Sequence, residues 1–302
     1  MKRLILALTL LASLPISAEP LWQGKGRIAL SSDGNEHDHD DWAATPLTLA
    51  LLAARGLQDK VVLYTYADHI WGSNLDKPNS RGKSAYEHIQ ESALGAKEWF
   101  GYDKSEFICA VDDPERAYNA MAKVIDASTK KNPLIIIAAG PMQVVGEALN
   151  RSKKEARQYV TVISHSKWNN IHSDTPSPRE KQHGKDVGHT GWTFAEMEES
   201  FGTESGGGAR FVQIIDQNGG DGYEGLAAPK ADFDWIKSSS ARSHSAYKEG
   251  SWDWLYSRIQ LGLAQKGVLY DASDAGMAIF MLTGEERTNA EMAREIMENP
   301  TK

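Results

Sequence analysis

Cysteine is almost absent from this chain of 302 residues, which contains Cys109 alone. One cysteine cannot form a disulfide within the chain, so a small fold held together by disulfides is excluded. Cys109 lies in the apolar stretch 107–111, which favours a buried structural thiol over a reactive nucleophile. The chain must therefore rely on a hydrophobic core, and its length suits one large domain.

Basic residues are outnumbered, because 33 Lys and Arg stand against 41 Asp and Glu and give a net charge of −8. Proteins that bind nucleic acids neutralise phosphates with clustered Lys and Arg, so we expect no nucleic-acid partner. Two common motifs are also missing. The sequence has no Gly-x-Ser-x-Gly elbow of a serine hydrolase, and its glycines 206–208 lack the Lys-Ser/Thr of a phosphate loop. An acidic chain of this kind is suited to binding cations.

Long apolar runs are scarce, and the only one opens the sequence. Two basic residues precede the apolar residues 4–14, and a Ser-Ala pair at 17–18 offers a cleavage point, as in a secretory signal peptide. A membrane anchor is the alternative, but a bilayer span needs about 20 apolar residues. We expect residues 1–18 to be removed on export. The mature protein, residues 19–302, would then be periplasmic or secreted and have no membrane segment.

Short apolar runs rich in β-branched residues alternate with segments of helical periodicity. Five runs are predicted to be buried strands: 27–30, 61–66, 134–138, 159–163 and 211–215. Four segments are predicted to be helices: 46–54, 83–100, 114–128 and 143–149. This alternation predicts a single α/β domain with a mostly parallel open sheet and helices on both faces. Residues 165–223 break the pattern, and we expect them to form a long loop insertion near the site.

The first predicted strand leads into an acidic loop at residues 31–41. Its aspartates are Asp33, Asp38, Asp40 and Asp41, and one glutamate lies among them. These carboxylates repel one another unless a cation lies between them, and calcium takes about six to eight oxygen ligands. Capping of the following helix would account for one acid only. Because ligands bind at the carboxyl ends of parallel strands, the loop is a candidate metal site.

The spacing of these acids is not that of an EF-hand. An EF-hand needs Gly at its sixth position and Glu at its twelfth, where this chain has Asp38 and Ala44. Calcium is nevertheless the cation we expect, because carboxylate oxygens prefer hard ions. His37 and His39 leave zinc or manganese open, since imidazole suits softer ions.

Two side chains outside the acidic loop are candidates for contact with a ligand. Asp68 follows the predicted strand 61–66 and so lies at the carboxyl end of a strand. Trp252 offers an aromatic face on which a sugar or base can stack, although a tryptophan there could equally fill the core.

Together these features resemble the nucleoside hydrolase superfamily. Its members open with a strand that leads into an Asp-rich loop ending in Asp-Asp, as Asp33 and the pair at 40–41 do here. The Asn-Glu pair at 35–36 is similar to a secreted branch sometimes labelled cellulose-binding. Three further blocks are similar to motifs of the family: 135–142, 229–234 and 273–278.

The resemblance implies a nucleoside hydrolase-like fold and hydrolysis of an N- or O-glycosidic bond in a small nucleoside or carbohydrate. It implies a calcium ion held by Asp33, Asp41, the Ala139 carbonyl and Asp274, and the acidic loop adds Asp38 as a candidate ligand. It further implies that Asp33 acts as general base toward a water molecule. The residues implied to contact sugar hydroxyls are Asp40, Asp232 and Asp234. The group that protonates the leaving atom stays open among His244, His165, His172 and His189.

The sequence departs from the family in the residues that would contact a substrate. Ser273 stands where the family has His, and Leu226 stands where it has Asn. Asp232 and Asp234 replace Glu and Asn. We expect metal binding and water activation to survive, whereas nucleoside recognition need not be retained.

Two alternatives therefore stand beside the hydrolase. One is a calcium-dependent carbohydrate-binding protein without turnover, and the other is a zinc or manganese hydrolase that uses His37 or His39. The sequence leaves open the substrate, the leaving group and whether the protein forms oligomers.

Overall fold

A computed structural model describes residues 19–34, 39–68, 82–140, 142–166, 169, 191–220 and 222–301. These residues contain a six-stranded sheet in which all neighbouring strands are parallel. In spatial order the strands are β3 (Glu106–Cys109), β2 (Val61–Tyr66), β1 (Arg27–Ser31), β4 (Leu134–Ala138), β5 (Val160–His165) and β6 (Arg210–Ile214). The predicted α/β class with a parallel open sheet is confirmed.

The order of the strands changes direction at the middle of the sheet. From β1 the chain proceeds outward to β2 and β3, then places β4 on the other side of β1 and continues to β5 and β6. Leu30 of β1 therefore lies opposite Tyr64 on one side and Ile137 on the other. At such a switch point a crevice opens beyond the carboxyl ends of the two central strands, and ligands bind there.

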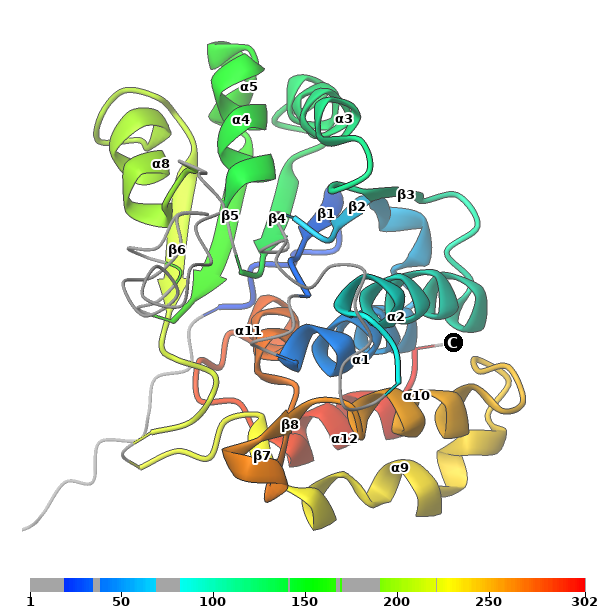
Figure 1. Cartoon of the computed structure of the whole chain (residues 1–302). Coiled ribbons are helices and arrows are strands. Elements are labelled where there is room, and N and C mark those ends of the chain that lie inside the picture. Colours follow the sequence, from blue (N-terminus) through cyan, green and yellow to red (C-terminus); the bar gives the residue numbers. More distant parts are fainter. Residues whose placement is uncertain are drawn as a thin grey trace, which may run out of the picture.

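Helices cover both faces of the sheet (Figure 1). On one face lie α1 (Asp40–Ala54), α2 (Ala85–Phe100) and α11 (Gly276–Thr283), with α10 (Ser251–Ile259) and α12 (Ala290–Glu298) packed beyond them. On the other face lie α3 (Pro114–Asp126), α4 (Gln143–Arg151) and α8 (Phe194–Phe201). Alternate side chains of β1 enter the two cores, because Ile28 and Leu30 pack with the first group of helices and Ala29 with the second.

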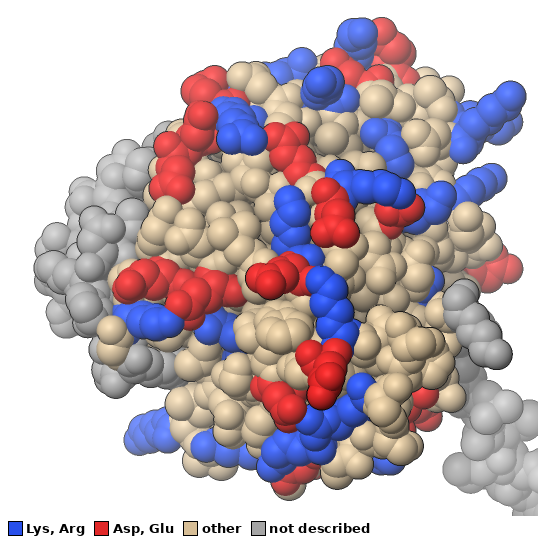
Figure 2. Space-filling view, turned by 90° about the vertical axis from the view of Figure 1, so that its right-hand side faces the viewer, with Lys and Arg blue, Asp and Glu red and all other residues tan. Residues whose placement is uncertain are grey.

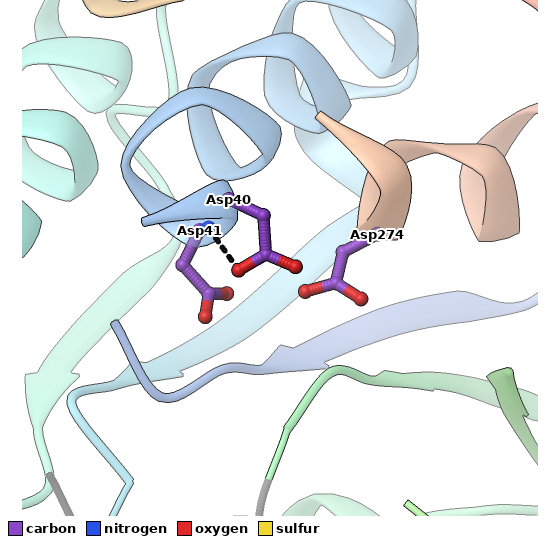
Figure 3. A group of neighbouring side chains, drawn as sticks. All are labelled: Asp40, Asp41 and Asp274. Atoms are coloured by element: carbon purple, nitrogen blue, oxygen red, sulfur yellow. Dashed lines mark hydrogen bonds between the residues drawn. The ribbon is translucent and has the colours of Figure 1, made fainter. Parts of the chain in front are cut away.

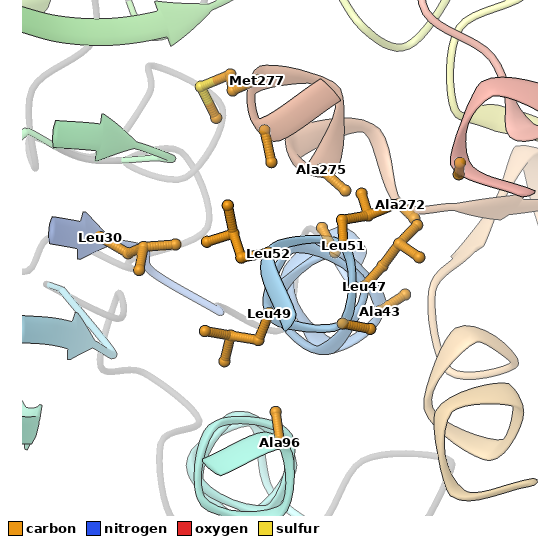
Figure 4. Packing of buried hydrophobic residues seen from close by; sticks show 14 of the residues in the cluster. Leu30, Ala43, Leu47, Leu49, Leu51, Leu52, Ala96, Ala272, Ala275 and Met277 are labelled. Carbon is orange, nitrogen blue, oxygen red and sulfur yellow. The ribbon is translucent and has the colours of Figure 1, made fainter. Parts of the chain in front are cut away.

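Helix α1 is buried along its whole length. Its leucines point outward on several sides, among Leu30 of β1, Ala96 of α2 and Ala272 (Figure 4). The helix begins six residues earlier than the predicted 46–54, because Asp40 and Asp41 form its first turn. Carboxylates are favoured at that end by the unpaired N–H groups and the helix dipole.

The first turn of α1 is held by two other helices. Pro46 has no N–H, so it cannot donate to the carbonyl of Trp42 four residues earlier. The hydroxyl of Ser92 on α2 donates to that carbonyl instead, at 2.7 Å. Arg258 on α10 in turn donates to the Ser92 hydroxyl through Nε, at 2.9 Å. This chain of contacts fixes the turn that carries two of the candidate metal ligands.

Some elements are missing from the sequence prediction. A small antiparallel sheet has the order β7 (Ala227–Pro229), β9 (Leu269–Asp271) and β8 (Leu263–Ala264). Strands of two or three residues are too short to show a period of two. Strand β3 has only four residues and was not among the predicted strands for the same reason.

The predicted loop insertion at 165–223 contains regular structure among its described residues. Helix α8 lies within it, as does β6, which corresponds to the predicted strand 211–215. Helix α8 begins with a capping box between Thr193 and Glu196, and it buries Phe194 and Met197. Its polar and acidic neighbours hid this short amphipathic pattern. Residues 167–168 and 170–190 lie outside the described residues.

Charged side chains of both signs are interspersed on the face shown in Figure 2. Several charged residues form pairs, such as Arg151 with Glu115 and Lys104 with Asp59. Exposed pairs of this kind contribute little to stability. In the part of the chain that the structure describes, no helix combines the length and the apolar character that a membrane span requires.

Candidate metal centre

The loops after the two central strands meet at Asp33. This residue follows β1 and is 5% exposed. Its carbonyl accepts a hydrogen bond from Ala67 N at 3.0 Å, while Ala139 N donates to Ser31 O at 2.9 Å. Gly140 has a positive φ of 81°, and a Cβ at that position would lie 2.5 Å from Asp33 Oδ1. The backbone after β4 therefore rests directly on the Asp33 carboxylate, and only glycine fits there.

Three further carboxylates come together beside this loop. Asp40 and Asp41 begin α1, and Asp274 lies in the short helix η6 (Ser273–Ala275) that precedes α11. Each offers one oxygen, these oxygens lie within 4.8 Å of one another, and all three residues are buried (Figure 3). Two oxygens on opposite sides of one calcium ion are about 4.8 Å apart, so the spacing suits a single cation.

No hydrogen bond among the described residues offsets the charge of Asp41. It is 1% exposed, and neither of its carboxylate oxygens has a hydrogen-bond partner there. Burial raises the pKa of Asp41 well above its usual value, and the neighbouring charges of Asp33, Asp274 and Asp40 raise it further. An isolated buried charge is costly, and a cation offsets that cost. The residues present therefore fit a bound cation.

A cavity of about 20 Å³ is lined by Asp41, Asp274 and Ala139. Part of its wall is the hydroxyl of Tyr64, which hydrogen-bonds to Ser32 Oγ at 2.6 Å and to Thr45 Oγ1 at 2.7 Å. One water needs about 10–15 Å³ of such space. The cavity therefore has room for one small occupant at the switch point of the sheet.

His165, the last residue of β5, contacts Asp274 of the carboxylate group. Its Nε2 lies 2.5 Å from Asp274 Oδ1, and the ring is 2% exposed. The backbone N–H of Gln217 donates to Nδ1 at 3.2 Å. Asp216 Oδ1 is 3.7 Å from the same nitrogen, which is beyond hydrogen-bonding distance.

Burial lowers the pKa of His165, but the contacts with Asp216 and Asp274 outweigh that effect and raise it to about 9. A cation on Asp274 would weaken this upward shift, because it neutralises the carboxylate. The N–H of Gln217 also requires an unprotonated Nδ1. We therefore assign the neutral ring, with its proton on Nε2, to the protein with a cation bound.

The structure brings together most of the predicted metal ligands. Asp33, Asp41, Ala139 and Asp274 lie around the same cavity or against one another. Asp40, assigned by the resemblance to sugar hydroxyls, belongs to the carboxylate group that could hold the metal. The remaining predicted ligand, at position 38, and the histidine at position 37 lie outside the described residues.

His39 and Asp68 lie near the site and make contacts within the protein. The ring of His39 packs against Trp42, with centroids 4.6 Å apart, and His39 is not part of the carboxylate group. Asp68 is fully buried at the end of β2, and its Oδ2 accepts a hydrogen bond from Val144 N at 2.9 Å. Asp68 thus holds the first turn of α4, which follows the loop containing Ala139.

The two aspartates of the predicted sugar-binding block are not brought to the carboxylates. They follow β7, which runs antiparallel to β9, so that Ala227 lies opposite Asp271 and Pro229 opposite Leu269. The chain therefore moves away from Asp274 before it reaches Asp232 and Asp234, both of which are exposed. Asp234 pairs with Lys237 at 2.7 Å and accepts a hydrogen bond from the Tyr256 hydroxyl at 3.0 Å.

His244 and Trp252 lie at the other end of α2 from the site. Helix α10 runs antiparallel to α2, because Arg258 bonds to the carbonyl of His88 whereas Lys248 bonds to the carbonyl of Glu98. The ten residues between those carbonyls span about 15 Å of helix. Trp252 is 1% exposed and packs in the core, and both residues line a separate pocket. The other two candidate proton donors, at 172 and 189, lie outside the described residues.

No protein-family model matches the sequence. A curated protein from Formosa agariphila, named "uncharacterized protein P22", is 31% identical over 269 residues, which cover 86% of this chain and 84% of that protein. Among solved structures, that of the type III effector XopQ in complex with adenosine diphosphate ribose aligns with 93% of this chain and 94% of its own. Its sequence identity is 13% and the TM-score is 0.42.

Proposed function

The chain belongs to the same family as protein P22 of Formosa agariphila, and we propose that it is a metal-dependent hydrolase of glycosidic bonds. The observation that carries the proposal is the group Asp40, Asp41 and Asp274, buried at the ends of the central strands with the Asp41 oxygens unpartnered among the described residues. The sequence blocks that resemble nucleoside hydrolases support it, since Ala139 and Asp274 line the same cavity and Asp33 lies against Gly140.

The cation we propose is calcium. Asp33, Asp41, Asp274 and the Ala139 carbonyl would hold it, together with Asp40. A ligand set made only of oxygen favours a hard cation, and His39 is not part of the carboxylate group. When bound, a divalent cation lowers the pKa of water and neutralises charge that develops during the reaction.

The residues of this chain would carry the proton and hold the substrate. Asp33 would accept a proton from the attacking water, because its carboxylate lies at the rim of the carboxylate group against Gly140. The substrate would be a small nucleoside or carbohydrate, and the bond cleaved would be an N- or O-glycosidic bond. The apolar run at 4–14 supports export, so we place the reaction in the periplasm or outside the cell.

A binding protein without turnover is the second candidate, and one observation favours it. Hydrolysis needs a group that protonates the leaving atom, yet His165 uses both ring nitrogens and His244 lies at the remote end of α2. Ser273, which replaces the histidine of the family, donates to Asp40 Oδ2 at 3.3 Å instead. Among the described residues, the candidate proton donors are thus occupied or distant.

A turnover assay distinguishes the two candidates. Purified mature protein with calcium would be tested on a panel of nucleosides and aryl glycosides, with the Asp33→Asn variant as a matched control. Release of base or aryl alcohol by the wild type alone supports the hydrolase. Calcium-dependent binding of oligosaccharides without release from any substrate would replace the hydrolase with the binding protein.

A further inference from the structure

Asp274 is contacted by His165, and His165 in turn is contacted by Gln217. His165 ends β5, and Gln217 lies three residues beyond β6. The Gln217 backbone N–H donates to His165 Nδ1, and His165 Nε2 lies 2.5 Å from Asp274 Oδ1. A continuous chain of hydrogen bonds thus runs from the edge of the sheet to a candidate metal ligand.

The side chain of Gln217 is held by hydrogen bonds at both its amide nitrogen and its amide oxygen. It is fully buried, and its side-chain amide donates to the carbonyls of Ile215 and Glu286 at 2.7 and 2.9 Å. Its Oε1 accepts a hydrogen bond from Thr288 Oγ1 at 2.6 Å. A Cβ on Gly276 would lie 2.3 Å from the same oxygen, so α11 begins in close contact with this side chain. The N–H that faces His165 is therefore held at a defined place.

The position of the ring decides which role it can play. With Nδ1 accepting from Gln217, the proton of a neutral imidazole is on Nε2 and is donated to Asp274. Both nitrogens are then engaged, and only 2% of the residue is exposed. Such a ring cannot easily donate a proton to a substrate. It can, however, fix the orientation of a carboxylate and leave the second oxygen of that carboxylate to a cation.

We propose that His165 is a positioning residue that orients Asp274 for the cation, with Gln217 holding the ring. The inference rests on the proposed function in one respect, namely that a cation binds at these carboxylates. It goes beyond that function by assigning a role to a histidine that lies about 110 residues before the ligand it positions and in the segment predicted as a loop insertion.

The test compares two substitutions of His165 whose amide side chains differ in length. In His165→Gln the side-chain N–H can take the place of Nε2–H and donate to Asp274. In His165→Asn the amide is one carbon shorter and falls short of it. Calcium is titrated into the metal-free mature protein by calorimetry, with folding checked by circular dichroism. His244→Asn serves as the matched control at a histidine outside the site.

We expect His165→Asn to weaken calcium binding about 10–100-fold, as removal of such outer contacts does, and His165→Gln to stay near the wild-type affinity. The control should bind as the wild type does. Equal affinities of a folded His165→Asn variant and the wild type would overturn the positioning role while leaving the metal site intact. Absence of calcium binding by the wild type would remove the proposed function and this inference with it.

Discussion

The sequence suggested two groups of candidate residues, and the fold places them in different surroundings. One is the carboxylate group at the carboxyl end of β1, and the other contains His244 and Trp252. Asp33, Asp40 and Asp41 lie at the carboxyl edge of the sheet because they follow the parallel strand β1, and Asp274 reaches them from the short helix η6 after β9. The second cluster lies at the start of α10, where Trp252 fills the core. Residue type suggested both groups, whereas position after a parallel strand distinguished the acidic loop at 31–41 from the second cluster.

The largest expected effect is at Asp33. If this carboxylate accepts the proton of the attacking water, Asp33→Asn should lower kcat by about 10²–10⁴-fold while the fold is kept. The amide retains a carbonyl oxygen but cannot accept that proton. His244→Gln, in the second cluster, should leave kcat within about twofold of the wild type, because His244 lies at the other end of α2 from the site. A twofold change corresponds to less than 1 kcal/mol. Wild-type turnover by Asp33→Asn would contradict the mechanism.

Trp252 should matter for stability and not for the metal. Its ring packs edge-on against Trp235 and Tyr247, at centroid distances of 5.8 and 5.2 Å. Truncation to alanine should cost about 3–5 kcal/mol of unfolding free energy, measured by denaturant titration. Calcium affinity at temperatures where the variant is folded should be unchanged. A loss of calcium affinity in folded Trp252→Ala would show that Trp252 affects the carboxylate group, so that the two regions are not independent.

Ser92 should show a smaller cost that depends on Pro46. Ser92→Ala leaves the carbonyl of Trp42 without its donor, at a cost of about 1–3 kcal/mol. In a Pro46→Ala background the restored N–H can donate to the same carbonyl, so the cost should fall. A double-mutant cycle on unfolding free energies measures this coupling. Additive effects would show that Ser92 does not substitute for the missing N–H.

The smallest effect is expected at Asp234. The residue is exposed and pairs with Lys237 outside the carboxylate group, so Asp234→Asn should leave calcium affinity and melting temperature unchanged. Calorimetric titration and thermal unfolding of the variant check this. A loss of calcium affinity of about tenfold, or 1.4 kcal/mol, would place Asp234 in the metal centre after all.

Much of the fold followed from local pattern. The strands β1, β2 and β4 and their following loops were predictable, because buried parallel strands are short, apolar and β-branched. The proposed ligand role of Asp274 came from resemblance, since no local pattern links it to Asp33. The exposed positions of Asp232 and Asp234 could not be predicted, because they depend on the unpredicted pairing of two three-residue strands, β7 and β9.

The contacts made by His165 and Gln217 could largely not be predicted from the sequence. Gln217 carries no motif, and its role depends on four contacts made by residues between 165 and 288. One signal was present, because Asp216 and Gln217 follow β6 just as Asp33 follows β1. His165 stood among the candidate proton donors, but only the structure shows that both its nitrogens are engaged.

Thermal unfolding of the mature protein in calcium and in excess chelator tests the central claim most directly. A ligand that binds only the folded state at 100 times its dissociation constant stabilises it by about 2.7 kcal/mol. We therefore predict a higher melting temperature in calcium, and predict that Asp41→Asn reduces this difference sharply because it removes the buried unpartnered carboxylate. The same melting curve in calcium and in chelator, from protein shown to be metal-free in the chelated sample, would contradict the account.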